Sequence, residues 1–109
     1  MRILVSGSLA YDRIMDFPGY FRDSILPDKI HSLNVSFAVS DLRESFGGTA
    51  GNIAYNLALL GHRPAVVAAA GHDVAPYRRW LMRRGVDCRA VRSVDDQPPA
   101  EVTIITDRD

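Results

Sequence analysis

The stretch FGGTAGNIAYNLALLG, residues 46–61, has the pattern of a glycine turn that leads into a helix. Ile53, Leu57 and Leu60 recur at helical spacing with alanines beside them, so one apolar stripe can pack against a sheet. Gly61 follows the last apolar residue, which is where a helix typically ends. We therefore predict a helix that starts near the glycine pair and packs on the core through this stripe.

The amino end of this predicted helix has the features of a ligand site. Gly47 and Gly48 carry no side chains, so a ligand can approach the backbone, and free N–H groups of a first helical turn attract negative charge. Asn52 adds a donor and an acceptor at the same place. No Gly-Lys-Ser/Thr follows, which excludes the Walker A pattern, and the glycine spacing does not fit the dinucleotide fingerprint. A glycine turn that only leads into a core helix remains the alternative.

The composition is that of one ordinary globular domain. The 109 residues are 47% hydrophobic, and 13 basic residues balance 13 acidic ones, so no overall charge favours nucleic acid or an anionic membrane. Cys88 is the only cysteine, which excludes a disulfide within the chain and fits a reducing cytoplasm. The apolar start is too short for a signal peptide or a membrane span. We expect a cytoplasmic protein that binds neither nucleic acid nor a membrane.

Apolar runs that end in turn residues predict the strands of an α/β fold. Residues 3–5 and 65–70 are apolar throughout, which is typical of buried parallel strands. A further strand is expected at 86–91, with Cys88 as a small buried hydrophobe, and a last one at 101–106. Charged turn residues follow the last strand at once, so we expect the chain to stop within a hairpin.

A second helix is expected after residue 73. Asp73 is a candidate N-cap, Pro76 suits the first turn, and Gly85 suits the end of the helix. The helix carries a basic cluster that we interpret as a solvated face, formed by Arg78, Arg79, Arg83 and Arg84. The three histidines share no ligand spacing, so we expect no metal on His31, His62 or His72.

Residues 31–41 alternate between apolar and small or polar side chains, which predicts a strand with two different faces. The apolar face consists of Leu33, Val35, Phe37 and Val39. Ser36 lies on the other face, where it could meet a ligand. This pattern fits an antiparallel flap rather than a strand of the parallel sheet. The apolar face needs cover, either from the protein's own core or from a second flap in a dimer.

Asp12 follows the first predicted strand within a few residues. It would therefore lie near the carboxyl end of that strand, where ligands bind in open α/β sheets. An ionised carboxylate can accept hydrogen bonds from two neighbouring hydroxyl groups of a polyol. The alternative is a turn aspartate that bonds its own backbone.

Taken together, three separated pieces resemble one known family. GSLAYD at 7–12 follows the first strand, a long flap intervenes, and GGTAGN at 47–52 opens a helix that ends in LLG; Gly71 and Gly85 form a second glycine pair. This combination resembles the amino-terminal third of the ribokinase-like (PfkB) carbohydrate and nucleoside kinases, across essentially the whole chain. Within that family, FPGYF and LPDKIHSLNVSF look most like bacterial adenosine kinases.

The resemblance implies an α/β, Rossmann-like ribokinase fold whose small β-sheet lid is formed by about residues 13–46, inserted after the first strand. It also implies a site for a sugar or nucleoside. The substrate-binding positions that it implies are Ser8, Asp12, Ser36, Gly47, Gly48 and Asn52. In this family Asp12 would hold vicinal ribose hydroxyls and the glycine pair with Asn52 would line them. The lid would cover the acceptor, and such lids often form the interface of a homodimer.

Two departures qualify this resemblance. The family's catalytic aspartate and ATP site belong to a second signature, which we expect beyond Asp109, so these residues by themselves are predicted to be inactive. ATP and Mg²⁺ are therefore expected as cofactors of the intact enzyme, with a site mostly outside this sequence. Val102 stands where bacterial adenosine kinases tend to carry an aromatic residue, so adenosine is only modestly favoured over a free sugar.

Two functions of other classes stay open. One is a non-catalytic module that binds a nucleoside or sugar or that dimerises through its flap. The other is a plain nucleotide-binding α/β domain.

Overall fold

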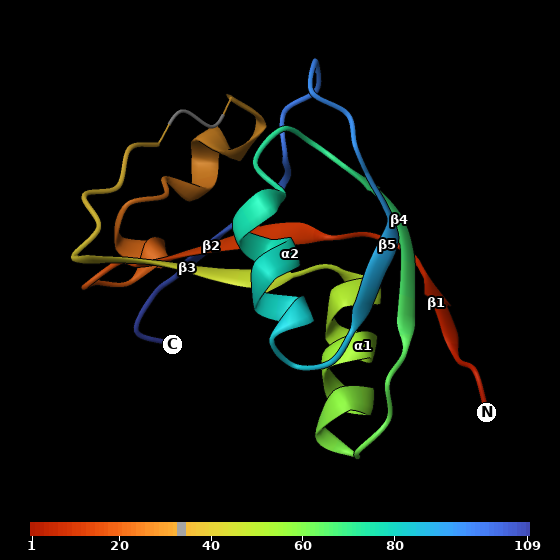
Figure 1. Ribbon diagram of the computed structural model, residues 1–109. Coiled ribbons are helices and arrows are strands. Elements are labelled where there is room, and N and C mark those ends of the chain that lie inside the picture. Colours follow the sequence, from red (N-terminus) through yellow and green to blue (C-terminus); the bar gives the residue numbers. More distant parts are fainter. Residues whose placement is uncertain (33–34) are drawn as a thin grey trace. The chain divides into compact units, whose positions relative to one another are not determined.

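The computed structural model describes residues 1–32 and 35–109 (Figure 1). These residues form two compact units. The first unit contains Met1–Asp12 and Ser45–Val102, and the second contains Arg13–Glu44 and Thr103–Asp109. In chain order the elements are β1 (Leu4–Ser6), β2 (Ala10–Asp16), the short 3₁₀ helices η1 (Phe21–Asp23) and η2 (Pro27–Ser32), β3 (Asp41–Gly47), α1 (Thr49–Leu59), β4 (Ala65–Ala70), α2 (Ala75–Met82), β5 (Asp87–Ser93) and β6 (Ala100–Thr106).

The first unit is built on a parallel sheet in the order β1-β4-β5. β1 pairs with β4 in parallel, with Val5 opposite Val66, and β4 pairs with β5 in parallel. Helix α1 precedes β4 in the chain, and helix α2 lies between β4 and β5 (Figure 1). Each pair of neighbouring parallel strands is therefore joined by a crossover connection that contains a helix. The predicted parallel strands are confirmed, and β4 has the bounds that its apolar run indicated.

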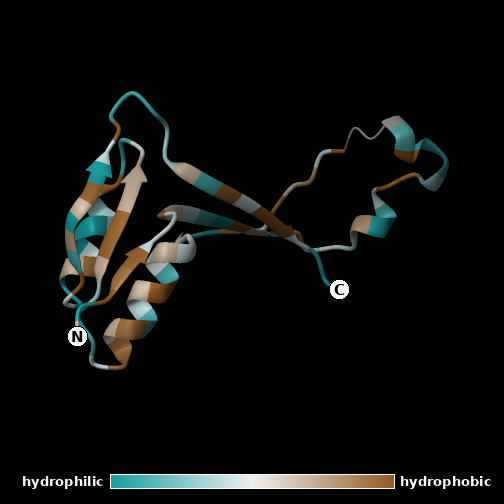
Figure 2. Cartoon of the chain, turned by 90° about the vertical axis from the view of Figure 1, so that its right-hand side faces the viewer, coloured by the Kyte–Doolittle hydropathy of each residue, from teal (hydrophilic) through white to brown (hydrophobic). Residues whose placement is uncertain are grey.

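The two helices cover one face of this sheet, and the other face stays open in the described chain (Figure 2). Val5 and Val66 are buried in the core with Tyr77 and Leu81 of α2. Leu4 is 68% exposed and Val67 41% exposed, because neighbouring residues of a strand point to opposite faces. The prediction that these strands are buried on both faces is therefore wrong for the described residues.

Helix α1 begins after Gly48, whose φ is 87°, and it is followed by Gly61, whose φ is 89°. Both glycines therefore mark the ends of the helix, as predicted. The predicted apolar stripe is only partly right. Ala54 is buried in the core, and Leu57 and Ala58 pack against it, whereas Ile53 is 51% exposed and Leu60 75% exposed. The fully buried positions of the helix are the small residues Ala50, Gly51 and Ala54, which let the helix lie close to its neighbours.

Helix α2 buries Tyr77 and Leu81, and its N-cap is Val74 rather than the predicted Asp73. Its basic cluster is only partly a solvated face. The Arg78 guanidinium is half-buried and donates from Nη2 to the Val91 carbonyl at 2.7 Å. The Arg84 guanidinium lies 4.0 Å from the centre of the Trp80 ring.

In the second unit, the predicted strand within residues 31–41 is wrong. Residues 35–40 form no strand, η2 ends at Ser32, and β3 begins only at Asp41; Leu33 and Asn34 lie outside the described residues. Alternating burial is kept only in part: Val35 and Phe37 are half-buried and Ser36 is exposed, but Val39 of the predicted apolar face is 38% exposed. An alternation of apolar and polar residues indicates which side chains face apolar surroundings. A strand also needs a neighbouring segment to which its backbone can hydrogen-bond, and the alternation does not show whether one is present.

The apolar surroundings of this segment are an aromatic cluster within the second unit. The Phe37 ring centre lies 4.9 Å from that of Phe17 and 4.9 Å from that of Phe21. The strands that reach into this unit belong to a second sheet, in the order β3-β2-β6. No helix of residues 1–32 and 35–109 has the length and apolar character needed to cross a membrane.

Candidate functional site

Ser8 lies in the turn after β1 and caps helix α1 from outside the helix. Its Oγ accepts a hydrogen bond from the Thr49 N–H at 3.0 Å, and its carbonyl accepts one from the Ala50 N–H at 3.0 Å. Further along, the Asn52 N–H donates to the Gly48 carbonyl at 3.0 Å. This last bond is the first regular bond of the helix, whereas Thr49 and Ala50 belong to the first turn, whose N–H groups have no partner within the helix. The prediction that the first-turn N–H groups are free for a ligand is therefore wrong for Thr49 and Ala50.

Asp12 lies on β2, a strand that the sequence analysis did not predict, and its carboxylate lies against Gly47. A Cβ atom at Gly47 would collide with this carboxylate. Glycine is thus required here because Asp12 occupies the space of a side chain. Asp12 is half-buried and Gly47 buried. The structure brings Asp12 and the glycine pair together within one unit.

Gly48 is constrained in two ways. Its φ of 87° and ψ of 151° belong to a region that residues with a side chain rarely adopt. A Cβ there would also lie 2.8 Å from the backbone nitrogen of Ala10 and close to the Ser8 carbonyl. The glycine pair therefore packs directly on the chain that leads from Ser8 into β2.

A buried tyrosine holds this turn in place. The Tyr77 hydroxyl donates to the Gly47 carbonyl at 2.7 Å. Helix α1 can approach this hydroxyl only because Gly51 has no side chain, since a Cβ there would collide with it. Burial, followed by the nearby charge of Asp12, raises the pKa of Tyr77 to about 12, so the hydroxyl stays a donor at neutral pH.

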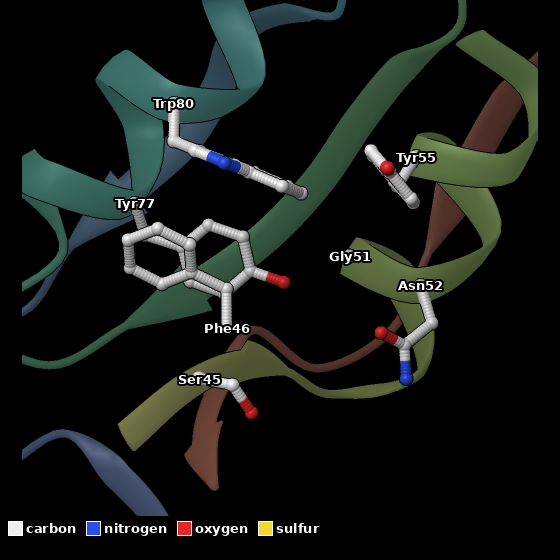
Figure 3. Close-up of a pocket in the computed structure, with 7 residues that line it drawn as sticks. All are labelled: Ser45, Phe46, Gly51, Asn52, Tyr55, Tyr77 and Trp80. Carbon is white, nitrogen blue, oxygen red and sulfur yellow. The ribbon is translucent and has the colours of Figure 1, made fainter. Parts of the chain in front are cut away.

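Asn52 is exposed and lines a half-open hollow of about 380 Å³ in the first unit (Figure 3). Tyr55 comes to this hollow from α1, and Tyr77 and Trp80 come from α2. Ser45 and Phe46, at the end of β3, complete it with Gly51. The hollow is mostly aromatic with a few polar groups, which is the usual make-up of small-molecule sites.

The other predicted site residues differ in their setting. Ser8 is exposed, but its hydroxyl and carbonyl are bound to the start of α1. Ser36 belongs to the second unit and is exposed. The ligand roles of Ser8, Asp12, Ser36, Gly47, Gly48 and Asn52 stay predictions.

Sequence reasoning missed two tyrosines near this site. Tyr77, which holds the glycine turn, falls within the predicted second helix but was given no role there. Tyr11, whose hydroxyl donates to the Asp73 carbonyl, was not singled out. The two tyrosine rings lie 6.0 Å apart. The sequence holds only a weak signal for the role of Tyr77. A tyrosine on the apolar side of a helix usually has a buried hydroxyl that needs a hydrogen-bond partner, and Gly51 on the other helix leaves room for it. Within the described ranges, no group of three or more histidine, cysteine or acidic side chains could hold a metal ion.

Comparison with known proteins identifies the family. Residues 9–109 match the model of the pfkB family carbohydrate kinases, so the chain belongs to this family. A nucleoside kinase of Methanothermobacter thermautotrophicus is 29% identical over an alignment 109 residues long, which covers 98% of this chain and 32% of that protein.

Two solved structures share the fold. Burkholderia thailandensis nucleoside kinase in complex with inosine is 38% identical, with a TM-score of 0.79 over 99% of this chain and 33% of that one. The nucleoside kinase of Methanocaldococcus jannaschii, a ribokinase-family member, has a TM-score of 0.80 at 22% identity over 98% of this chain and 33% of that one, which bears on the fold alone. The chain therefore has the fold of the amino-terminal part of ribokinase-like kinases and spans about a third of the length of these relatives.

Proposed function

We propose that this chain is the acceptor-binding part of a kinase that transfers the γ-phosphate of ATP to a ribose hydroxyl of a nucleoside or sugar. The observation that carries the proposal is the Asp12 carboxylate packed against Gly47, next to the start of the helix that carries Asn52. A carboxylate accepts hydrogen bonds only, which suits two adjacent hydroxyl groups. Family membership supports this reading.

Within this proposal the residues of the chain bind and orient the acceptor. Asp12 accepts from a diol, Gly47 and Gly48 allow its close approach, and Asn52 offers an amide to the same hydroxyls. Because the Gly47 carbonyl is held by Tyr77, the turn is positioned before the substrate arrives. The base that takes the acceptor proton is proposed to come from the part of the relatives that this chain does not cover, and the 109 residues by themselves are proposed to be inactive.

ATP and Mg²⁺ are proposed as cofactors, and together they would supply the transferable phosphoryl group. The B. thailandensis enzyme has also been solved in complex with ADP-inosine, which supports a nucleotide donor. No described residue is assigned to the metal, since no fitting cluster of ligands is found among residues 1–32 and 35–109.

An adenosine-like nucleoside is the proposed acceptor, with a free sugar as the alternative. The inosine complex of the B. thailandensis relative supports a purine nucleoside. We further propose that the segment of about residues 13–46 acts as a lid that keeps water from the phosphoryl transfer, and that two such lids form a homodimer. Ser8 and Ser36 are proposed to contact the ligand. The protein is proposed to be cytoplasmic.

The test is binding by the intact gene product. Asp12→Asn keeps the size of the side chain but removes its charge, and it should weaken adenosine and ribose binding about tenfold to a hundredfold, the range of a lost charged hydrogen bond. Binding of adenine, which has no hydroxyl groups, should hardly change. Asp95→Asn, on an exposed loop aspartate, is the matched control and should change neither.

Equal losses for adenosine and adenine would show that Asp12 does not hold hydroxyl groups. Phosphorylation of adenosine by the 109 residues without any further chain would refute the proposed inactivity. Adenosine binding by the intact protein without any phosphoryl transfer would instead favour the non-catalytic module.

A further inference from the structure

A basic cleft lies at the amino ends of the parallel strands, in the first unit. Its volume is about 700 Å³, and it is lined by Arg2, Arg63, Arg78, Arg89 and Asp87 together with apolar residues. Arg2 precedes β1, Arg63 precedes β4, and Asp87 and Arg89 lie at the start of β5. Because the amino ends of parallel strands meet at one edge, these arginines converge at the edge opposite to the turn after β1 that carries Ser8.

The charge in this cleft is not balanced. The whole chain carries 13 basic and 13 acidic residues, yet four arginines here face one aspartate. That aspartate is committed to Arg89, whose Nε lies 3.0 Å from each Asp87 carboxylate oxygen and whose Nη2 lies 2.6 Å from Oδ2. This bond to Arg89 lowers the pKa of Asp87 to about 2, so the pair stays charged at neutral pH.

The three other arginines form no direct ion pair with the described residues. Arg2 and Arg63 are exposed and form no ion pair or side-chain hydrogen bond there, although the charge of Arg2 also acts on Asp87. Arg78 is half-buried and makes one hydrogen bond, to the Val91 carbonyl, while its Nε is buried without a partner. A guanidinium that is partly withdrawn from water and lacks a counter-charge is costly, so an anion beside it would be stabilising.

The volume of the cleft and the chemistry of its arginines together indicate which class of ligand it can bind. A volume of about 700 Å³ falls within the roughly 300–1,000 Å³ that small-molecule sites span, so the cleft can admit more than one phosphate group. Guanidinium groups bind phosphate oxygens through paired N–H donors and keep their charge at any physiological pH. Three guanidinium groups around this cleft suit an anion that carries several linked negative charges.

We propose that this cleft binds a polyphosphate group, either as a free ion or carried by a nucleotide, through Arg2, Arg63 and Arg78. The site is separate from the acceptor residues, since none of Asp12, Gly47, Gly48 or Asn52 lines it. It therefore stands whether or not the proposed kinase function is correct.

The test is titration calorimetry of the purified protein with inorganic tripolyphosphate and, separately, with ATP. Arg63→Gln is the main variant, because glutamine keeps a long polar side chain at this exposed position but removes the charge. It should weaken tripolyphosphate binding about tenfold, as expected for a lost charged hydrogen bond. Arg2→Gln, at an exposed residue next to the chain start, should weaken it to a similar degree and guards against a folding defect in the first variant.

Arg92→Gln is the matched control. Arg92 is an exposed arginine of β5, the strand that also carries Arg89 of the cleft. It does not line the cleft, and its replacement makes the same change in net charge as Arg63→Gln. It should alter the affinity less than about twofold, because only distant screened charge is lost. Asp12→Asn should leave tripolyphosphate binding unchanged, which separates this site from the acceptor site.

The results of these titrations support or overturn the proposed polyphosphate site as follows. Tripolyphosphate binding that depends on Arg63 supports a site for the free group, and ATP binding that depends on Arg63 without tripolyphosphate binding supports a nucleotide. Absence of binding for both probes at millimolar concentration overturns the proposal. Equal losses in Arg63→Gln and Arg92→Gln would also overturn it, since they would reveal general electrostatic attraction.

Discussion

The carboxyl and amino ends of the same parallel sheet differ in how far their polar groups are paired within the protein. After β1, at the carboxyl end, backbone groups are paired within the protein: Ser8 satisfies the first N–H groups of α1, and Tyr77 satisfies the Gly47 carbonyl. At the amino end, the side chains of Arg2 and Arg63 form no ion pair or hydrogen bond with the described residues, although the charge of Arg2 acts on Asp87. The first end is rigid before any ligand binds, whereas the second holds charge that a ligand would neutralise.

This contrast indicates how each end responds to mutation. At the carboxyl end a substitution disturbs packing and buried hydrogen bonds, so stability should change along with binding. At the amino end Arg2, Arg63 and Arg89 are exposed, so their substitution should change ligand affinity while stability is retained. The following predictions run from the largest expected effect to the smallest.

Gly48→Ala should be the most damaging change at the carboxyl end. The side chain would be forced into a strained backbone conformation and into the Ser8 carbonyl, so we expect a loss of at least about 3 kcal/mol in the free energy of unfolding. Urea denaturation followed by circular dichroism measures it. Gly61→Ala is the control, because Gly61 has a similar φ of 89° but nothing within 4 Å of an added Cβ, and it should lose only about 1–2 kcal/mol. Equal losses would mean that strain alone, without the Ser8 contact, sets the cost.

Tyr77→Phe should come second. It removes the donor to the Gly47 carbonyl and leaves that buried group unpaired, which should lower the free energy of unfolding by about 1–3 kcal/mol. Tyr55→Phe is the matched control, since the Tyr55 hydroxyl makes no hydrogen bond to the described residues, and its loss should stay within about 0.5 kcal/mol. If both variants unfold at the same urea concentration, the Tyr77 hydroxyl does not hold the glycine turn.

Asp87→Asn at the amino end should have the smallest effect, and an opposite one. It removes the carboxylate that pairs with Arg89, so the cleft becomes more positive and tripolyphosphate should bind about two- to threefold more tightly. Calorimetry measures the affinity, and the unfolding midpoint should hardly move because the Arg89 side chain of the pair is 83% exposed. Weaker binding in this variant would contradict the idea that Asp87 opposes the anion. Asp95→Asn, on the loop after β5, again serves as the control.

Local chemistry determined much of the fold in advance. The apolar run 65–70 predicted β4 because a strand buried among others needs little beyond apolar residues and a turn. Gly61 and Gly85, with φ of 89° and 85°, follow their helices because only glycine adopts this backbone cheaply. The motifs around Asp12 and the glycine pair likewise carried the family resemblance, which the match over residues 9–109 confirms.

Only the tertiary structure decided which groups meet. The outward turn of Ile53 depends on how closely the small residues of α1 approach the sheet, and helical periodicity does not contain that distance. Residues 35–40 alternate like a strand but lack a strand partner, which is a property of two segments and not of one. The same reason explains why Gly47 leaves room for the Asp12 carboxylate and why Arg2, Arg63 and Arg78 come together from three separate parts of the chain. Packing sets the contacts between residues that are far apart in the chain.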